Sequence, residues 1–141
     1  MSSAGEVKTR VQSWGMVQEA SCFVRTPESV EDLRGIFGEA KHRGLLVAQR
    51  GGGNSYGDPA MLEGGILIDY AKLNRVIHWD PENGLLEAEP GLTIKDAWRT
   101  VLESGYWLPV VPGTMFVTFG GAAAMNIHGK NNFKKSTFGS H

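Results

Sequence analysis

The sequence is poor in cysteine and has no long hydrophobic run. Its 141 residues include one cysteine, Cys22, which excludes an intramolecular disulfide and offers no cysteine cluster for a metal. Cys22 lies in a strand-like run, residues 20–25, so we expect an inert buried thiol. No apolar stretch approaches the ~20 residues of a membrane span. Residues 1–10 lack the apolar core of a signal peptide, which favours a cytoplasmic location.

The chain also lacks a strong excess of charge of one sign. It carries 14 lysines and arginines against 15 aspartates and glutamates, a formal net charge of −1. Because acids and bases are mixed, we expect no general affinity for nucleic acid or for an anionic membrane surface. The one local exception is a group of basic residues near the end of the sequence, Lys130, Lys134 and Lys135.

A first helix is predicted after residue 26. Thr26 supplies a capping hydroxyl, Pro27 suits the first helical position, and Glu28 places an acid in the first turn. Gly44 would end the helix as a C-terminal cap. Apolar residues at helical spacing predict one buried stripe, which consists of Val30, Leu33, Phe37 and Ala40.

A second helix has a clearer pattern than the first. Thr93 is the expected N-cap, with Asp96 three residues later in the capping-box position, and Gly105 ends the segment. Apolar residues follow the i, i+3, i+4, i+7, i+8 pattern that places them on one helix face. They are Ile94, Ala97, Trp98, Val101 and Leu102.

The remaining apolar segments read as strands. Residues 45–48 and 66–68 are short apolar runs, and residues 74–79 and 85–89 flank a turn-rich segment that predicts a hairpin. Strands and helices without steady alternation indicate an α+β fold, with a small mixed sheet and two main helices. Residues 1–18 are expected to be loosely ordered and 19–141 to form one unit.

A glycine-rich loop follows the first of these strands. In RGGGNSYGD, residues 50–58, glycines permit positive φ and close approach of a ligand to the backbone. Successive N–H groups can form an anion-binding nest, and a guanidinium suits phosphate oxygens. The alternative is a plain surface turn. The candidate phosphate-binding residues are Arg50, Gly51, Gly52, Gly53, Asn54, Ser55, Tyr56, Gly57 and Asp58.

Two common nucleotide motifs do not fit this loop. A dinucleotide fingerprint would need glycine where Tyr56 stands, and a P-loop would need lysine where Asp58 stands.

A second candidate segment, residues 118–125, is rich in glycine and alanine. If it forms a short helix capped by Thr118, its free N–H groups would face an anion. The alternative is tight packing of that helix on a sheet.

Three ordered motifs resemble the vanillyl-alcohol oxidase superfamily, whose FAD-binding domain is called PCMH-type. Residues 51–55 are similar to its pyrophosphate-binding loop, and residues 112–122 to its second flavin-contacting segment. Residues 126–131, NIHGKN, resemble the branch of the decaprenylphosphoryl-β-D-ribose oxidases. The resemblance covers residues 20 to 141. It implies FAD as cofactor, with further contacts from Gly113, Thr118, Gly120, Gly121, Asn126, Ile127 and His128.

The resemblance also implies how FAD is held and used. Many members carry a histidine covalently bonded to flavin where this chain has Asn54, so the cofactor is expected to be non-covalent. In the ribose-oxidase branch, the flavin takes hydride from a sugar CH–OH carbon. His128 would then assist proton movement, and Lys130 would bind a substrate oxygen or phosphate. Both residues are therefore candidate catalytic residues.

Family members are several hundred residues long. The resemblance therefore implies that this chain is the first, N-terminal FAD-binding subdomain, truncated before a second subdomain and a substrate domain, and inactive alone. Bare apolar surface around residues 117–127 would favour self-association. Alternatives are a relative that acts on an aldonolactone, an alditol or a 2-hydroxy acid, or a non-redox module that binds a phosphorylated ligand.

Overall fold

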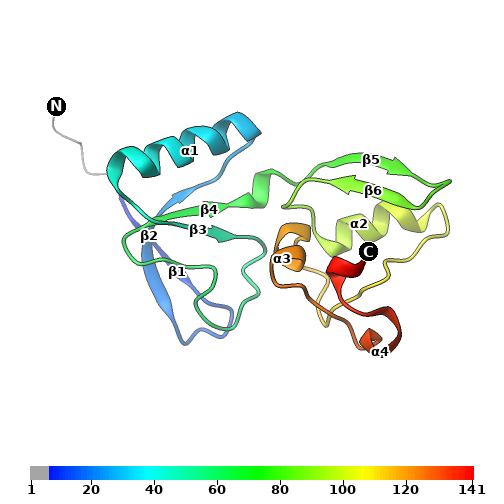
Figure 1. Cartoon of the computed structure of the whole chain (residues 1–141). Helices are drawn as coiled ribbons and strands as arrows, with labels where there is room; N and C mark the ends of the chain where they lie inside the picture. The colour runs from blue at the N-terminus through cyan, green and yellow to red at the C-terminus, as the bar shows by residue number, and fades with distance from the viewer. Residues whose placement is uncertain (1–6) are drawn as a thin grey trace. The chain divides into compact units, whose positions relative to one another are not determined.

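The computed structural model describes residues 7–141, which fall into two compact units. Unit 1 extends to Lys72, and unit 2 runs from Leu73 to His141. Figure 1 shows unit 1 as a sheet with one long helix, and unit 2 as a two-stranded ribbon with shorter helices. The sequence contains no linker that predicts this division.

Unit 1 is built on a four-stranded mixed sheet. The strands are β1 (Thr9–Gln12), β2 (Glu19–Arg25), β3 (Val47–Arg50) and β4 (Ile66–Asp69). Their order is β1-β2-β4-β3, with β1 antiparallel to β2 and β4 parallel to both β2 and β3. The small mixed sheet predicted from the sequence is confirmed.

The central strand β4 supplies the core of unit 1. Its residues Ile66, Leu67 and Ile68 are fully buried, because both faces of the sheet are covered. Ile66 and Ile68 pack on one face, with α1 (Val30–Arg43), and Leu67 packs on the other with Cys22. The predicted burial of Cys22 is therefore confirmed.

The start and buried face of α1 differ from the prediction. Pro27 is fully buried ahead of the helix, and Ser29 is the N-cap, accepting from the Asp32 amide at 3.0 Å. Val30 and Phe37 of the predicted stripe are 63% and 47% exposed. The buried face instead consists of Leu33, Ile36 and Ala40, which is an equally regular helical spacing. Gly44, at φ 62°, ends the helix as predicted.

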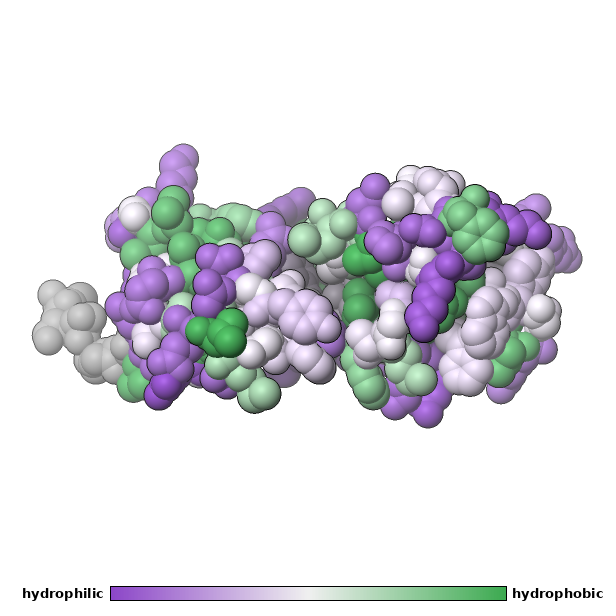
Figure 2. Space-filling view, turned by 90° about the horizontal axis from the view of Figure 1, so that it is seen from below, coloured by the Kyte–Doolittle hydropathy of each residue, from purple (hydrophilic) through white to green (hydrophobic). Residues whose placement is uncertain are grey.

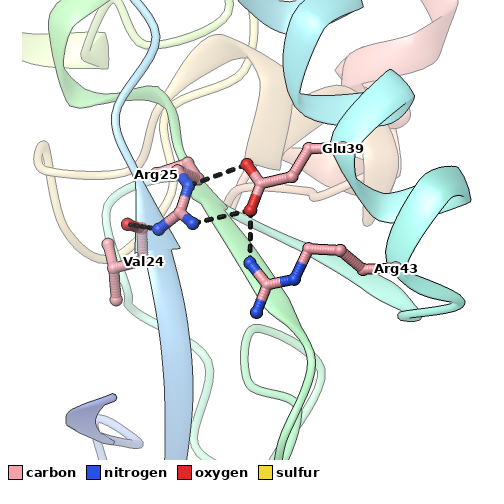
Figure 3. A network of polar contacts seen from close by, with 4 residues as sticks. All are labelled: Val24, Arg25, Glu39 and Arg43. Carbon is pink, nitrogen blue, oxygen red and sulfur yellow. Dashed lines mark hydrogen bonds and ion pairs between the residues drawn. The ribbon is translucent and has the colours of Figure 1, made fainter. Parts of the chain in front are cut away.

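A charged network fastens α1 to β2 (Figure 3). The Glu39 carboxylate accepts from Arg25 Nε at 3.0 Å and Nη2 at 2.7 Å, and also from Arg43. The hydrogen bonds from Arg25, supported by Arg43, lower the pKa of Glu39 below its usual value. All three side chains are less than a third exposed. The network thus fixes α1 to the strand that directly precedes it in the sequence.

Part of the expected loose N-terminus belongs to the sheet. Residues 9–12 form β1, and the turn at 13–18 returns the chain to β2. The expectation for residues 1–18 is thus corrected for this strand, and residues 1–6 lie outside the described part of the chain. A short 3-10 helix, η1 (Tyr70–Lys72), ends unit 1.

Unit 2 begins with the predicted hairpin, β5 (Val76–Asp80) and β6 (Leu85–Ala88). The Asp80 carboxylate closes the turn by accepting from the Glu82 and Asn83 amides. Helix α2 (Ile94–Leu102) follows, with Thr93 as N-cap as predicted. The later elements are short: α3 (Phe119–Ala124), α4 (Asn132–Lys135) and η2 (Phe138–Ser140).

Helix α2 is fixed by apolar and aromatic contacts. Ile94, Ala97 and Val101 are buried, as the predicted face requires, whereas Leu102 is 44% exposed. The Trp79 indole of β5 donates to Ser104 Oγ at 3.2 Å, just beyond the helix, and packs edge-on against Tyr106. The end of α2 is thereby tied to the hairpin.

The surface is mixed in polarity. On the face shown in Figure 2, hydrophobic residues lie among hydrophilic ones in both units. Among residues 7–141, no helix is long and apolar enough to cross a membrane.

Candidate cofactor site

The glycine-rich loop leaves the edge strand β3. The strand lies two residues later than predicted, so Arg50 is its last residue and the loop begins at Gly51. Residues 51–58 form no helix or strand. Gly53 has φ 67°, a conformation that side chains with a Cβ rarely adopt. The glycine at this position is therefore required by the backbone.

The amides of the glycine triplet are available to a ligand. Within residues 7–141, no hydrogen bond is donated by the backbone of Gly51, Gly52 or Gly53. Backbone donors in folded proteins otherwise bond to protein groups or to water. Consecutive donors of this kind suit an anion, as the sequence predicts.

The sequence predicts that the Arg50 guanidinium is free to bind phosphate, but in the structure it already bonds to the protein. It donates from Nη1 to the Ala60 carbonyl at 3.4 Å and from Nη2 to the Gln12 carbonyl at 3.3 Å. A Cβ on Gly53 would stand 2.9 Å from Arg50 Cζ. In this structure the guanidinium therefore lies against the loop and supports its backbone.

The second half of the loop contacts the turn between β1 and β2. The Trp14 amide donates to the Ser55 carbonyl at 3.0 Å, and the Trp14 and Tyr56 rings meet edge-on at 5.3 Å. Tyr56 is 72% exposed. The Asp58 carbonyl accepts from the Met61 amide at 3.0 Å, which closes the loop. Asn54 and Gly57 are half-buried.

In unit 2, Thr118 caps α3 as predicted, but the amides of this helix are not free. Phe119 donates to the Leu92 carbonyl and Gly120 to the Pro90 carbonyl, both at 2.8 Å. Gly121 donates to the Thr118 hydroxyl oxygen at 3.3 Å. The expectation that this helix end presents free N–H groups to an anion is wrong, because the backbone of the preceding segment already uses them.

The glycines of α3 serve close packing instead. A Cβ on Gly120 would stand 2.8 Å from Pro90 Cβ, and one on Gly121 would stand 3.2 Å from Thr118 Oγ1. Gly113 is exposed and has open space where a Cβ would lie. Gly120 thus packs closely, but against the segment between β6 and α2 and not on a sheet, while Gly121 meets the N-cap of its own helix.

Asn126 and Ile127 hold the C-terminal segment. Asn126 has φ 44°, and its side-chain oxygen accepts from the Gly139 amide at 2.9 Å. The Ile127 carbonyl accepts from the Phe138 amide at 2.8 Å. These contacts place η2 beside the residues expected to meet flavin, and Phe138 packs edge-on against Phe119.

The two candidate catalytic residues are exposed. His128 Nδ1 lies 3.4 Å from the Gly129 carbonyl and 3.4 Å from Asn132 Nδ2. Lys130 makes no ion pair within residues 7–141. Both side chains can therefore reach a ligand at this surface of unit 2.

Residues 7–141 contain no group of three histidine, cysteine or acidic side chains that could hold a metal.

Sequence comparison shows the family. The model of a family described as "FAD binding domain" matches residues 22–141, so the chain belongs to the PCMH-type FAD-binding domains. Decaprenylphosphoryl-β-D-ribose oxidase of Mycolicibacterium smegmatis is 36% identical over 133 residues, which is 94% of this chain and 29% of that protein. Glycolate oxidase subunit GlcD of Bacillus subtilis is 26% identical over 135 residues, also 94% and 29%.

The fold is shared with a solved structure of alkyldihydroxyacetonephosphate synthase. The two agree with a TM-score of 0.71 over 83% of this chain and 24% of that one, at 20% identity. The α+β fold predicted from the sequence is thus that of part of a PCMH-type domain. The chain spans less than a third of the two sequence relatives.

The residues present fit one part of FAD. The free amides of the glycine triplet match the oxygens of a pyrophosphate, and the absence of side chains there lets the group reach the backbone. The N-terminal end of α3 contributes no free donors, but Ala123, Ala124 and Met125 at its other end leave an exposed apolar surface.

The sequence does not predict the contacts that the loop makes with backbone groups of Gln12, Trp14 and Ala60, because no motif indicates them.

Proposed function

We propose that this chain is the FAD-binding part of an oxidoreductase that oxidises a CH–OH group of a sugar or alcohol, with FAD held non-covalently. The observation that carries the proposal is the row of free amides at Gly51, Gly52 and Gly53, in a chain that belongs to a family of FAD-binding domains. FAD, when bound, supplies the capacity to accept hydride from carbon.

The residues of this chain have separate roles in the proposal. The glycine loop binds the pyrophosphate, and Asn54 stands where a covalent link would need a nucleophile. His128 moves the hydroxyl proton of the substrate, and Lys130 binds a substrate oxygen or phosphate. Their exposure supports these roles, because an exposed imidazole and an ammonium can meet a substrate without rearrangement of the core.

A second candidate is oxidation of a 2-hydroxy acid. It is favoured by the similarity to the glycolate oxidase subunit of Bacillus subtilis over 94% of this chain. Aldonolactones and alditols are the other CH–OH substrates considered. Reduction of the flavin under anaerobic conditions by each compound class distinguishes these candidates, because only a substrate bleaches the flavin absorbance.

The test of cofactor binding is a titration of FAD into the full-length protein, with the expected second subdomain present, monitored by quenching of flavin fluorescence. Gly53→Val should abolish binding, because a β-branched residue resists φ 67° and would collide with Arg50. Gly38→Ala is the matched control, since a Cβ there meets nothing within 4 Å on α1. Normal FAD binding by Gly53→Val would show that the loop is only a turn.

A non-redox module for a phosphorylated ligand makes a different prediction. Such a protein would bind ADP or inorganic pyrophosphate as tightly as FAD, because only the phosphate groups would be recognised. We expect FAD to bind more tightly than either compound. Equal binding of all three would replace the oxidoreductase proposal with this alternative.

A further inference from the structure

The glycine loop is fastened to a segment that precedes the matched family region. That region begins at residue 22, whereas the loop contacts lie in β1 and in the turn at residues 13–18, which we call the N-terminal turn. Arg50 donates to the Gln12 carbonyl, and the Trp14 amide donates to the Ser55 carbonyl. Two backbone groups of this segment therefore hold opposite ends of the loop.

The approach of the N-terminal turn to the loop is close. A Cβ on Gly15 would stand 2.9 Å from the Tyr56 carbonyl oxygen, which is a backbone atom and cannot move aside cheaply. Ser13 is 5% exposed and its amide donates to the Gln18 carbonyl, so the turn is itself compact. The Trp14 and Tyr56 rings also meet edge-on, at 5.3 Å. The turn is thus packed on the loop.

Arg50 also supports the loop. Its guanidinium bonds to carbonyls before and after the loop, those of Gln12 and Ala60, and lies under Gly53. A guanidinium has several donors in a fixed plane, so one side chain can bond to two carbonyls at once. The glycines, which would otherwise be the most mobile residues, are thereby held in one conformation.

We infer that the N-terminal turn and Arg50 are positioning elements, which fix the glycine loop before its ligand arrives and so keep the amides of Gly51–Gly53 in place for it. The inference rests on the proposed function for the identity of the ligand, FAD. Ordering the loop in advance lowers the entropy cost of binding. Loss of this support should therefore weaken FAD binding without removal of any ligand-contacting amide.

The test uses two variants and two measurements. Gly15→Ala pushes the turn away from Tyr56, and Arg50→Met removes the guanidinium donors but keeps an unbranched apolar side chain. The first measurement is hydrogen exchange of the Trp14 and Met61 amides in the FAD-free protein, since these bond to loop carbonyls. We expect exchange to rise about tenfold in both variants, through local opening, and the Kd for FAD to rise about tenfold.

The controls are Gly38→Ala, where a Cβ meets nothing, and Arg34→Met, which removes an exposed arginine of α1. Both should leave exchange and Kd unchanged, and the Phe23 amide reports on the sheet. If Arg50→Met unfolds the sheet, the result for Gly15→Ala alone decides whether the inference holds. Unchanged exchange, or faster exchange with an unchanged Kd, would overturn the inference. Failure of FAD to bind to wild-type protein that also contains the expected second subdomain would refute the proposed function, while exchange alone would still test the support.

Discussion

Gly120 lies against Pro90: its amide donates to the Pro90 carbonyl at 2.8 Å, and a Cβ on Gly120 would stand 2.8 Å from Pro90 Cβ. The contact sets the first turn of α3 onto the segment between the hairpin and α2. Gly120 belongs to a family motif that is expected to contact the cofactor, but here it packs against another segment of unit 2. Its glycine is needed for the fold whether or not a ligand is bound.

Gly120→Ala should therefore destabilise the protein in the absence of FAD. The added methyl group forces Pro90 and α3 apart, and overpacking of this kind costs roughly 1–3 kcal/mol. Urea unfolding of the FAD-free variant measures the change in the free energy of unfolding. Gly113→Ala is the control, because a Cβ there has open space. Equal stability of Gly120→Ala and wild type would refute the close contact.

The Glu39 network predicts a loss of stability in acid. The hydrogen bonds from Arg25, supported by Arg43, lower the folded-state pKa of Glu39, so the network contributes its full stability above the ordinary pKa of a glutamate. That contribution falls as pH drops through the folded pKa. Glu39→Gln should cost roughly 1–2 kcal/mol at pH 7. The difference from wild type should shrink below pH 4, as followed by urea unfolding.

Glu31→Gln is the matched control for this measurement. Glu31 pairs with Arg34 on the exposed side of α1, and both side chains are more than 70% exposed. Exposed pairs of this kind contribute little to stability. A pH-independent difference between Glu39→Gln and wild type would mean that the Glu39 charge does not stabilise the fold.

Local sequence signals predicted the elements whose contacts are local. Thr93 caps α2 through the Asp96 amide, and the turn of the hairpin at Asp80 is closed by its own neighbours. The start of α1 was placed at Thr26 because a hydroxyl followed by proline resembles a cap. Ser29 with Asp32 three residues later was the better signal, since Asp32 also accepts from the Glu28 amide.

Long-range backbone contacts could not be predicted in the same way. The sequence predicts Arg50 as a phosphate ligand, because a guanidinium beside glycines suits an anion. In the structure it bonds to the carbonyls of Gln12 and Ala60, which the folding of the sheet and the loop brings close to it. The α3 amides likewise bond to Pro90 and Leu92 carbonyls. Any residue type can supply a carbonyl, so the sequence does not indicate which residues will accept these hydrogen bonds.

A third prediction concerns the exposed pair at the end of NIHGKN. His128→Gln and Lys130→Met should leave the free energy of unfolding within about 0.5 kcal/mol of wild type, because changes at exposed sites away from the core cost little. FAD affinity should also remain after Lys130→Met, whereas His128→Gln also removes an expected contact with FAD. In a full-length protein that contains the expected substrate domain, flavin reduction by a CH–OH substrate should slow in both variants, measured by anaerobic bleaching. Unchanged reduction rates would remove both residues from the proposed chemistry.

The last prediction follows from Asn54, which stands in the glycine loop where the family resemblance implies, for many members, a histidine bonded to flavin. The side-chain amide nitrogen of asparagine has its lone pair delocalised into the carbonyl, so it is too weak a nucleophile to form that bond. FAD bound to this protein should therefore separate completely from the polypeptide on acid denaturation. After centrifugation, the yellow colour and flavin fluorescence should be found in the supernatant. Asn54→Ala, which removes the amide, should release FAD in the same way, whereas flavin retained in the pellet of wild-type protein would reveal a covalent attachment at another residue.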